Sequence, residues 1–316
     1  MRAAQNPASF LMRILITGAG GFIGSHVTRL LVQQGHDVHA TILGDNDTVR
    51  IRDLLPRLHT IPCNLENPAE LESCLDAVRP ELCIHLAWYA VPGKYLSAPE
   101  NFGSLNATLH LARKLAALGC RRFVGIGTCF EYEHAGAVLS ETSPTKPRSL
   151  YAACKLAAAI VLEQFAALTP MQIAWVRLFY QYGPDEAPQR LMPYAITTLL
   201  KGQTLKLTPG EQVRDFLHIE DVASGIVAAA QSALTGIVNV GSAQPVTVRQ
   251  IAEKIAAIIG RPDLLALGAQ PYSPSDPMFV LADNSRLREN TGWKPRYDLD
   301  TGLRQTVEWW KNKLKS

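Results

Sequence analysis

Short apolar runs alternate with amphipathic stretches through the first 180 residues of the 316-residue chain. The runs are rich in β-branched residues and have the length of strands, whereas the stretches between them repeat apolar positions at helical spacing. The expected strands cover 13–17, 37–42, 58–62, 82–86, 122–127 and 171–178. The expected helices cover 22–34, 68–78, 99–118 and 149–168. Apolar strands separated by helices predict a parallel sheet that is covered on both faces and wound in the right-handed sense.

The pattern loosens after residue 180, where proline and glycine interrupt it more often. The apolar repeats of this part predict helices near 189–201, 219–232, 247–259 and 301–314. Two short apolar segments within 204–217 look like a hairpin. We therefore expect a main domain over 13–180 and a smaller lobe over 181–316 that is partly interleaved with the sheet. Residues 1–12 carry no such pattern and are expected to be a disordered extension.

Composition narrows the class of protein. The chain is 47% hydrophobic, and its formal charge of +3 is scattered along the sequence, so no basic stripe indicates nucleic-acid binding. No apolar run approaches the roughly 20 residues that span a bilayer, and residues 1–12 lack the features of a signal peptide. The six cysteines form no C-x-x-C pair, which favours a reducing compartment. We expect a soluble cytoplasmic protein without a membrane or nucleic-acid partner.

A glycine-rich turn between the first strand and the first helix carries the strongest chemical signal. The stretch RILITGAGGFIGSHV places Gly18, Gly21 and Gly24 where the strand turns into the helix. A side chain there would obstruct a pyrophosphate, and the helix N-terminus offers that anion unpaired N–H groups and a positive dipole. A turn without a ligand is the alternative, but the strand–turn–helix context favours a dinucleotide. The expected fold is therefore an α/β, Rossmann-like doubly wound parallel sheet with a smaller C-terminal lobe.

A tyrosine and a lysine one helical turn apart are the candidate catalytic pair. Tyr151 and Lys155 open the stretch YAACKLAAAIVLEQF, and a spacing of four places them on one helix face. A cationic lysine near a phenol stabilises the phenolate and lowers the tyrosine pKa, so the tyrosine can exchange a proton with a substrate hydroxyl. The pattern often occurs by chance, but here it follows the glycine turn by about 130 residues.

Together these motifs resemble the extended short-chain dehydrogenase/reductase family, whose members include nucleotide-sugar epimerases, dehydratases and reductases. The turn T-G-x-x-G-x-x-G, the pair Y-x-x-x-K and the later segments RLFYQYGP and RDFLHIEDV all match. The resemblance implies that Thr128 hydrogen-bonds the substrate oxygen, Tyr151 acts as acid or base, and Lys155 tunes Tyr151 and holds the nicotinamide ribose. The cofactor-binding residues it implies are Gly18, Gly21, Phe22, Ile23, Gly24, Asn64, Leu65, Leu86, Ala87 and Lys155.

The choice of dinucleotide depends on the residue that closes the second strand. An acid at that place bonds the adenosine ribose and favours NAD, but the place falls at Ile42 or Leu43. Asp45 and Asp47 follow slightly later, and Arg50 could reach a 2′-phosphate. We expect NADP as the cofactor, with NAD as the alternative; a solvated Arg50 without a ligand is equally open.

Three residues are candidates for substrate binding. Glu131 follows Thr128 by three residues and could contact a sugar or serve as a further acid or base, although an ordinary loop residue is the alternative. Tyr180 stands where the family often has an asparagine that contacts substrate phosphate. By resemblance, Arg214 would bind a nucleotide diphosphate, a bidentate task that suits guanidinium, and Asp215 would orient it. A purely structural pair of Arg214 with Asp215 is the other reading.

Several polar and thiol side chains are expected to be structural. His85 lies in a buried strand and is expected to be a core histidine. Cys129 and Cys154 lack a paired histidine base and are expected to pack. Asp221 is expected to cap or support a helix, and Thr247 to cap one. No His/Cys/Asp cluster has the spacing of metal ligands, so no metal is expected.

The leading hypothesis is an NADPH-dependent reductase of a 4-keto-6-deoxy sugar on a nucleoside diphosphate. Cys129 and Phe130 stand where a dehydratase would show an acid/base pair, which counts against dehydration. The alternative is a nucleotide-sugar 4-epimerase with tightly bound NAD, because the same catalytic residues serve both reactions. A non-nucleotide carbonyl substrate and a non-catalytic dinucleotide-binding regulatory protein are further alternatives. Relatives commonly dimerise through a helical bundle, so a homodimer through helices 99–118 and 149–168 is expected.

Overall fold

The computed structural model describes residues 11–274 and 276–315. Most of the predicted N-terminal extension, residues 1–10, lies outside the described residues. Its last residue does not behave as an extension: Met12 accepts a hydrogen bond from the Asp37 N–H at 3.1 Å and packs against the core. Met12 is therefore part of the folded domain.

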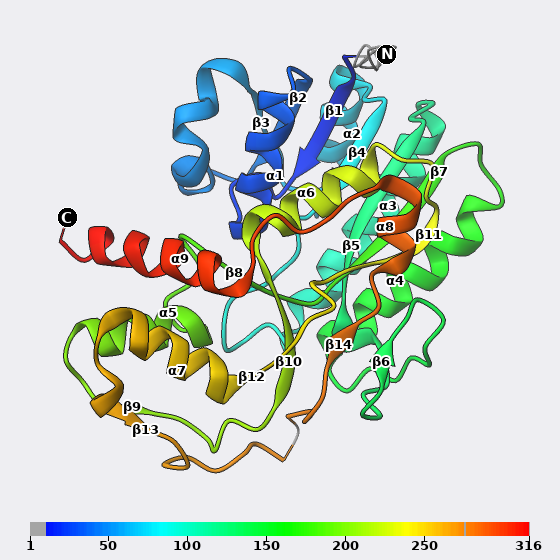
Figure 1. The fold of residues 1–316 in the computed structure, drawn as a ribbon. Coiled ribbons are helices and arrows are strands. Elements are labelled where there is room, and N and C mark those ends of the chain that lie inside the picture. Colours follow the sequence, from blue (N-terminus) through cyan, green and yellow to red (C-terminus); the bar gives the residue numbers. More distant parts are fainter. Residues whose placement is uncertain (1–10, 275, 316) are drawn as a thin grey trace, which may run out of the picture.

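Seven parallel strands form the central sheet, in the order β11-β7-β5-β4-β1-β2-β3 (Figure 1). They are β1 (Arg13–Thr17), β2 (Asp37–Ile42), β3 (His59–Pro62), β4 (Leu82–His85), β5 (Arg122–Thr128), β7 (Gln172–Leu178) and β11 (Gly236–Val240). The order reverses at β1, where neighbouring crossovers leave toward opposite sides, so a crevice opens at the carboxyl ends of β1 and β4. The predicted doubly wound sheet is confirmed.

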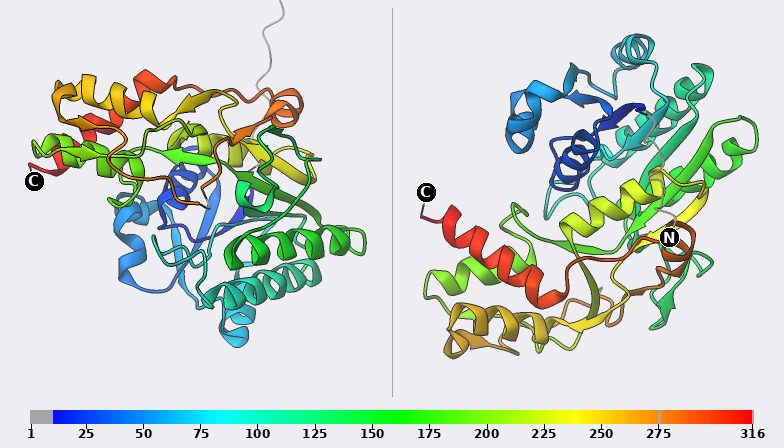
Figure 2. Two further views of the ribbon diagram at one scale, coloured as in Figure 1. Left: turned by 90° about the horizontal axis from the view of Figure 1, so that it is seen from below. Right: turned by 45° about the horizontal axis from the view of Figure 1, so that its top comes forward.

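Helices cover both faces of this sheet. They are α1 (Phe22–Gln33) and α6 (Ile219–Ala230) on one face, with α2 (Pro68–Val78), α3 (Glu100–Ala117) and α4 (Leu150–Ala166) on the other. In β1, Ile14 and Ile16 pack on the face covered by α1 and α6, whereas Leu15 packs on the face covered by α2, α3 and α4. This alternation is expected along a strand. Figure 2 shows α3 and α4 lying side by side along the outside of the molecule.

The C-terminal lobe lies over the carboxyl edge of the sheet. Its helices are α5 (Leu191–Leu200), α7 (Val248–Ile259) and α9 (Leu299–Lys313), which share one apolar core. Small sheets join β8 (Tyr180–Tyr182) with β10 (Val213–His218) and β12 (Pro245–Thr247), β9 (Leu205–Lys206) with β13 (Leu265–Ala266), and β6 (Val138–Leu139) with β14 (Leu281–Ala282). The short helices are η1 (Asp45–Arg57), η2 (Cys129–Glu131), η3 (Pro262–Leu264) and α8 (Ser285–Thr291).

The predicted hairpin within 204–217 is wrong. Strand β9 pairs with β13 and strand β10 pairs with β8 and β12, so the two strands of the supposed hairpin belong to different sheets. Residues distant in sequence supply the pairing partners, and local alternation carries no sign of them. The sheet also takes β11 from beyond residue 180, so the two parts of the chain interleave more deeply than the sequence pattern indicated.

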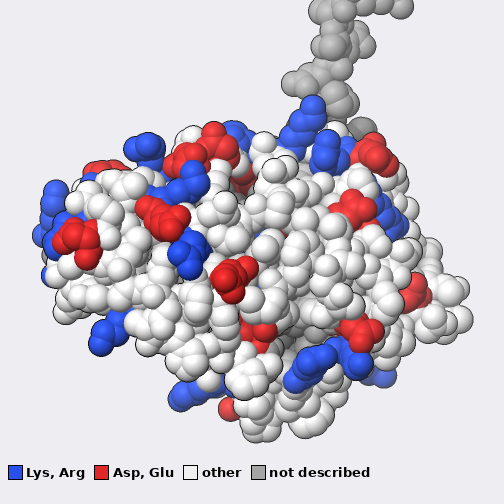
Figure 3. Space-filling view, turned by 60° about the horizontal axis from the view of Figure 1, so that its bottom comes forward, with Lys and Arg blue, Asp and Glu red and all other residues white. Residues whose placement is uncertain are grey.

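Surface charge is mixed on the face shown in Figure 3, where acidic and basic side chains are interspersed over the lobe and the sheet edge. No continuous basic stripe crosses that face. Among the described residues, no helix combines the length and apolarity needed to span a bilayer.

Candidate active site

The glycine turn joins β1 to α1 at the point where the sheet order reverses. Gly18 has a φ of +70°, and a β-carbon there would lie 2.7 Å from the Ala87 nitrogen. A β-carbon on Gly24 would lie 1.9 Å from the Gly18 oxygen. Gly21 caps α1 without any side-chain hydrogen bond, so the first N–H groups of the helix remain available to an anion. This bare turn fits a dinucleotide pyrophosphate.

The residues that follow β4 are hydrogen-bonded to the end of β1, directly before this turn. Leu86 donates its N–H to the Thr17 oxygen at 3.1 Å, and Ala87 donates its N–H to the Thr17 hydroxyl at 3.2 Å. Leu86 and Ile23 line the large cavity of the molecule, and Phe22 beside them is half-buried. The residues expected along the nicotinamide half of the cofactor therefore lie together.

Asp47, which follows β2 in the first turn of η1, packs close to the glycine turn. Asp47 accepts a hydrogen bond from the Leu43 N–H at 2.7 Å. Its carbonyl packs so closely on Gly20 that a β-carbon there would lie 1.5 Å from the oxygen. The first turn of η1 therefore folds back over the glycine turn and keeps the Asp47 carboxylate next to the residue that follows β2.

Arg50 also lies near the glycine turn, but it already has partners. Its Nε atom is 2.7 Å from the Asp185 carboxylate, and one terminal nitrogen donates to the Gly20 oxygen at 3.4 Å. At the far end of the expected adenosine site, Asn64 is exposed and its side chain accepts from the Glu66 N–H. Leu65 next to it is half-buried.

The three predicted catalytic residues converge on one wall of the cavity. Thr128 ends β5 and caps η2, whereas Tyr151 and Lys155 occupy the first two turns of α4, whose N-cap is Ser149. All three line the cavity. The Thr128 hydroxyl hydrogen-bonds the Tyr151 phenol, and the Lys155 Nζ atom lies 5.9 Å from the centre of the Tyr151 ring.

Lys155 is buried in an apolar and aromatic pocket. Its Nζ atom donates to the Ile126 oxygen at 2.6 Å and stands 3.7 Å above the Trp88 ring. Burial lowers the pKa of Lys155 to about 7, against an opposing effect of the Glu131 charge. Holding an ammonium ion in this place therefore costs free energy.

The Tyr151 pKa differs from the sequence expectation. Burial, with a smaller effect of Tyr95, raises the pKa of Tyr151 above the ordinary phenol value, and the Thr128 hydrogen bond opposes this only in part. The Tyr95 ring packs edge-on against Tyr151 with ring centres 4.8 Å apart. In the chain alone, desolvation therefore outweighs the effect of the neighbouring lysine that was expected to lower this pKa.

Glu131 is not a substrate ligand in this structure. It is fully buried, and its carboxylate accepts from the Thr128 N–H at 2.8 Å, from the Trp175 Nε1 atom at 3.1 Å and from Arg177 at 2.7 Å. Because these contacts engage both oxygens and face the core, Glu131 fixes the end of β5 that carries Thr128. The expected sugar contact is corrected accordingly.

Arg214 lies in the cavity wall, but its carboxylate partner is Asp276. The two are 2.6 Å apart, and the guanidinium carbon lies 5.4 Å from the centre of the Tyr180 ring, which also lines the cavity. Asp215 was expected to orient Arg214. It instead accepts from the N–H groups of Ser242, Ala243 and Ala282, which fastens the loop after β11.

The cavity has a volume of about 770 Å³ and extends from the sheet edge into the lobe. It contains polar residues that sequence reasoning did not select. Glu186 is buried, and one of its carboxylate oxygens has no hydrogen-bond partner; burial raises its pKa to about 8. Arg190 and Arg148 also reach the cavity. No motif distinguishes these residues in the sequence, although Glu186 and Arg190 follow the matched segment RLFYQYGP closely.

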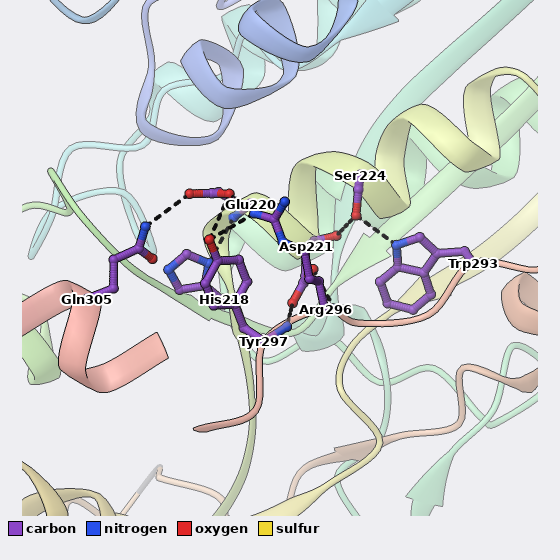
Figure 4. Close-up of polar contacts among 8 residues, drawn as sticks. All are labelled: His218, Glu220, Asp221, Ser224, Trp293, Arg296, Tyr297 and Gln305. Atoms are coloured by element: carbon purple, nitrogen blue, oxygen red, sulfur yellow. Dashed lines mark hydrogen bonds and ion pairs between the residues drawn. The ribbon is translucent and has the colours of Figure 1, made fainter. Parts of the chain in front are cut away.

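The matched segment RDFLHIEDV is mainly structural (Figure 4). Asp221 accepts from the N–H groups of Arg296 and Tyr297, both at 2.9 Å, which confirms the predicted support role. Glu220 accepts from the Tyr297 hydroxyl at 3.0 Å and from Gln305 of α9 at 3.3 Å. These bonds hold the chain that leads into α9 against the start of α6.

Other structural assignments agree with the sequence. His85 is buried between the hydroxyls of Thr17 and Thr108, and burial lowers its pKa to about 3. Thr247 caps α7 through a reciprocal pair of bonds with Gln250. Cys129 and Cys154, like the other four cysteines, are buried and free.

Comparison with known proteins agrees with this geometry. Residues 14–241 match the model of the NAD dependent epimerase/dehydratase family. A UDP-glucose 4-epimerase of Mycolicibacterium smegmatis is 28% identical over 96% of this chain and 99% of its own length. A UDP-glucuronate 4-epimerase of Thermodesulfobacterium geofontis is 26% identical, over 95% and 97% of the two chains.

Solved structures show the same similarity to nucleotide-sugar enzymes. A UDP-glucose 4-epimerase from Thermotoga maritima with UDP-glucose superposes with a TM-score of 0.85, at 26% identity and with 95% and 99% of the two chains covered. The protein MoeE5 in complex with UDP-glucose and NAD superposes at 0.81, with 29% identity over 95% and 99%. Because residues 14–241 match its family model and nearly the whole chain is covered by these relatives, the chain belongs to the NAD dependent epimerase/dehydratase family.

Proposed function

We propose that this enzyme is a nucleotide-sugar 4-epimerase that keeps NAD bound through its catalytic cycle. The observation that carries the proposal is the convergence of Thr128, Tyr151 and Lys155 on a cavity that Arg214 lines from the opposite lobe. A group that exchanges a proton with a sugar hydroxyl thus shares one cavity with a cation suited to phosphate. The similarity to two nucleotide-sugar 4-epimerases supports the same choice.

The chain's own residues provide binding and proton transfer. Tyr151 takes the proton from the sugar 4-hydroxyl and returns it after the ring has presented its other face. Thr128 holds the same oxygen, and Lys155 in its charged form stabilises the tyrosinate. Arg214 anchors the diphosphate while the sugar turns, and bound NAD would supply the reversible hydride acceptor.

NAD is proposed in preference to NADP because of the end of β2. Asp47, whose backbone packs on Gly20 and whose carboxylate accepts from the Leu43 N–H, would accept hydrogen bonds from ribose hydroxyls and repel a 2′-phosphate. Arg50, the residue that favoured NADP, is neutralised by Asp185 at 2.7 Å. Structural neighbours whose descriptions name NAD, among them an epimerase of Thermus thermophilus, support this choice.

A reductase of a nucleotide-linked 4-keto-6-deoxy sugar is the second candidate. It is favoured by the position of Arg50 beside the glycine turn, because release from Asp185 would free a guanidinium for a 2′-phosphate. Cys129 and Phe130 after Thr128 remain an argument against a dehydratase.

Turnover without added cofactor distinguishes the two candidates. For an epimerase we expect purified protein to release NAD on denaturation and to interconvert UDP-glucose and UDP-galactose without net consumption of nicotinamide. A reductase would instead oxidise NADPH in a one-to-one ratio with a 4-keto sugar. Product chromatography and mass spectrometry of the released nucleotide measure both quantities.

The Tyr151→Phe variant tests whether the site catalyses a reaction at all. Removal of the phenol hydroxyl should lower kcat by about 10²- to 10⁴-fold and leave the bound dinucleotide in place. Tyr194→Phe, on the exposed surface of α5, is the matched control. Unchanged turnover in Tyr151→Phe would exclude the mechanism, whereas a wild-type chain that binds dinucleotide without turnover would indicate a regulatory protein.

The proposal also includes assembly and location: the protein forms a homodimer in a reducing cytoplasm. The outward face of α4 carries Ala153, Ala157, Ile160 and Val161, and Phe102 of neighbouring α3 is 56% exposed. An apolar surface of this kind on two parallel-packed helices favours burial against a second copy. The six free, buried cysteines suit a compartment that keeps thiols reduced.

A further inference from the structure

A second cluster of reactive side chains lies at the opposite end of the sheet from the catalytic cavity. Asp37 and His39 stand two residues apart on β2, so their side chains share one face of the strand. The parallel register of β2 with β3 places His59 directly beside His39. The three residues are separate in the sequence pattern, and only strand pairing brings His59 to the other two.

The ligand atoms of this cluster already lie close together. The Asp37 Oδ1 atom is 3.0 Å from the His39 Nε2 atom and 3.5 Å from the His59 Nε2 atom. The two imidazole rings are stacked, with centres 4.7 Å apart and planes at 20°, and one donor atom from each of the three residues falls within 4.8 Å of the others. Two nitrogens bound to one tetrahedral zinc ion are roughly 3.4 Å apart, so only small side-chain movements are needed.

Burial and hydrogen bonding leave the histidine nitrogens available. The His39 Nε2 atom is shielded from solvent and makes no hydrogen bond of acceptable geometry, although Asp37 lies within ion-pair distance. The His59 side chain is 69% exposed and that of Asp37 39%, so the site is open to an ion and to a completing water.

The carboxylate of Asp37 is held in a fixed orientation by a neighbouring cation. Arg13 donates to the Asp37 Oδ2 atom at 3.1 Å, which leaves Oδ1 on the side of the histidines. The nearby Arg13 charge also weakens cation binding, so the site favours an ion that bonds to imidazole over one held by charge alone.

We propose that Asp37, His39 and His59 form a surface binding site for one zinc ion or another imidazole-preferring divalent transition metal. The site would join β2 to the edge strand β3 through a bond between side chains. It lies at the amino ends of these strands, about 16 Å along β2 from the glycine turn. This inference is independent of the proposed epimerase activity, because none of the three residues lines the catalytic cavity.

Zinc titration of the full-length protein without an affinity tag tests the proposal. We expect calorimetry or competition with a zinc indicator to detect one equivalent of Zn²⁺, which a large excess of Mg²⁺ or Ca²⁺ does not displace because those ions prefer oxygen ligands. His59→Gln and His39→Gln should each weaken zinc affinity at least about tenfold. His59 is exposed, so its variant should fold, and unchanged circular dichroism and NAD content verify this.

The matched control is His110→Gln. His110 pairs with a single carboxylate, that of Glu72 at 3.2 Å. This pair combines a histidine with a carboxylate, as the proposed site does, but it lacks the second histidine. Its variant should bind zinc as the wild type does. Absence of a stoichiometric zinc site, or His59→Gln binding as tightly as wild type, would overturn the proposal, as would equal weakening in His110→Gln.

Discussion

Lys155 shows the conflict between catalysis and stability at a single residue. Its ammonium group is nearly excluded from water, with one carbonyl and an aromatic face as its closest partners. Burial lowers its pKa from 10.5 to about 7. The folded chain therefore disfavours the same charge that stabilises a tyrosinate in the proposed mechanism.

Lys155→Met is expected to be inactive but more stable. Between pH 7 and 10.5 the unfolded chain binds a proton that the folded chain does not, so wild-type stability rises with pH in this window and the cost is complete below pH 7. The variant should gain up to a few kcal/mol near pH 7, and the gain should vanish above pH 10.5. Thermal unfolding of dinucleotide-free protein at several pH values measures the difference.

Exposed Lys94 provides the control for this experiment. Lys94→Met should leave the unfolding temperature unchanged at every pH. A Lys155→Met protein that is less stable than wild type at pH 7 would show that the contacts of the ammonium group outweigh its desolvation.

At the scale of elements, the strongest local patterns were predicted well. The bounds of β1, β2 and α2 agree with the sequence expectation, because short strands rich in β-branched residues and an amphipathic helix leave few alternatives. Helix η1 was missed because its sequence DNDTVRIRDLLPR is polar and contains Pro56. Strand β11 was missed because GIVNV is short and precedes a turn.

The candidate site was predictable to the extent that its residues lie in local motifs. The glycine turn, Tyr151 and Lys155 are motif residues, and the structure brings them to one crevice. The partners of Arg214 and Arg50 were not predictable, because Asp276 and Asp185 lie 62 and 135 residues away. Glu131 was misread for the same reason, since its partner Arg177 comes from the neighbouring strand.

The paired helices α3 and α4 lead to a prediction about assembly. Ile160→Glu places a charge at the centre of the exposed apolar face of α4, so a dimer formed there should dissociate. Light scattering after size exclusion should give about 34.6 kDa for the variant and twice that mass for wild type. Leu43→Glu, at a more exposed position on the loop after β2, should remain dimeric; a dimeric Ile160→Glu would place the interface elsewhere.

At the scale of the whole molecule, the catalytic cavity unites segments from nearly the full length of the chain. The glycine turn and Asp276 lie at opposite ends of the sequence, and the sheet and the lobe each supply part of the lining. Contacts such as Arg50 with Asp185 and Arg214 with Asp276 connect these segments. The site is therefore complete only when the lobe is folded against the carboxyl edge of the sheet.

The position of Trp88 makes its fluorescence a reporter of the cofactor's redox state. Of the five tryptophans, all among the described residues, Trp88 is the one that lines the cavity, and its indole lies beneath the Lys155 ammonium. A reduced nicotinamide seated in this cavity would accept excitation energy from the indole, so intrinsic fluorescence should fall as the ring is reduced and recover on reoxidation. Trp88→Phe should abolish most of that response, and stopped-flow emission could then follow single redox events inside a working site.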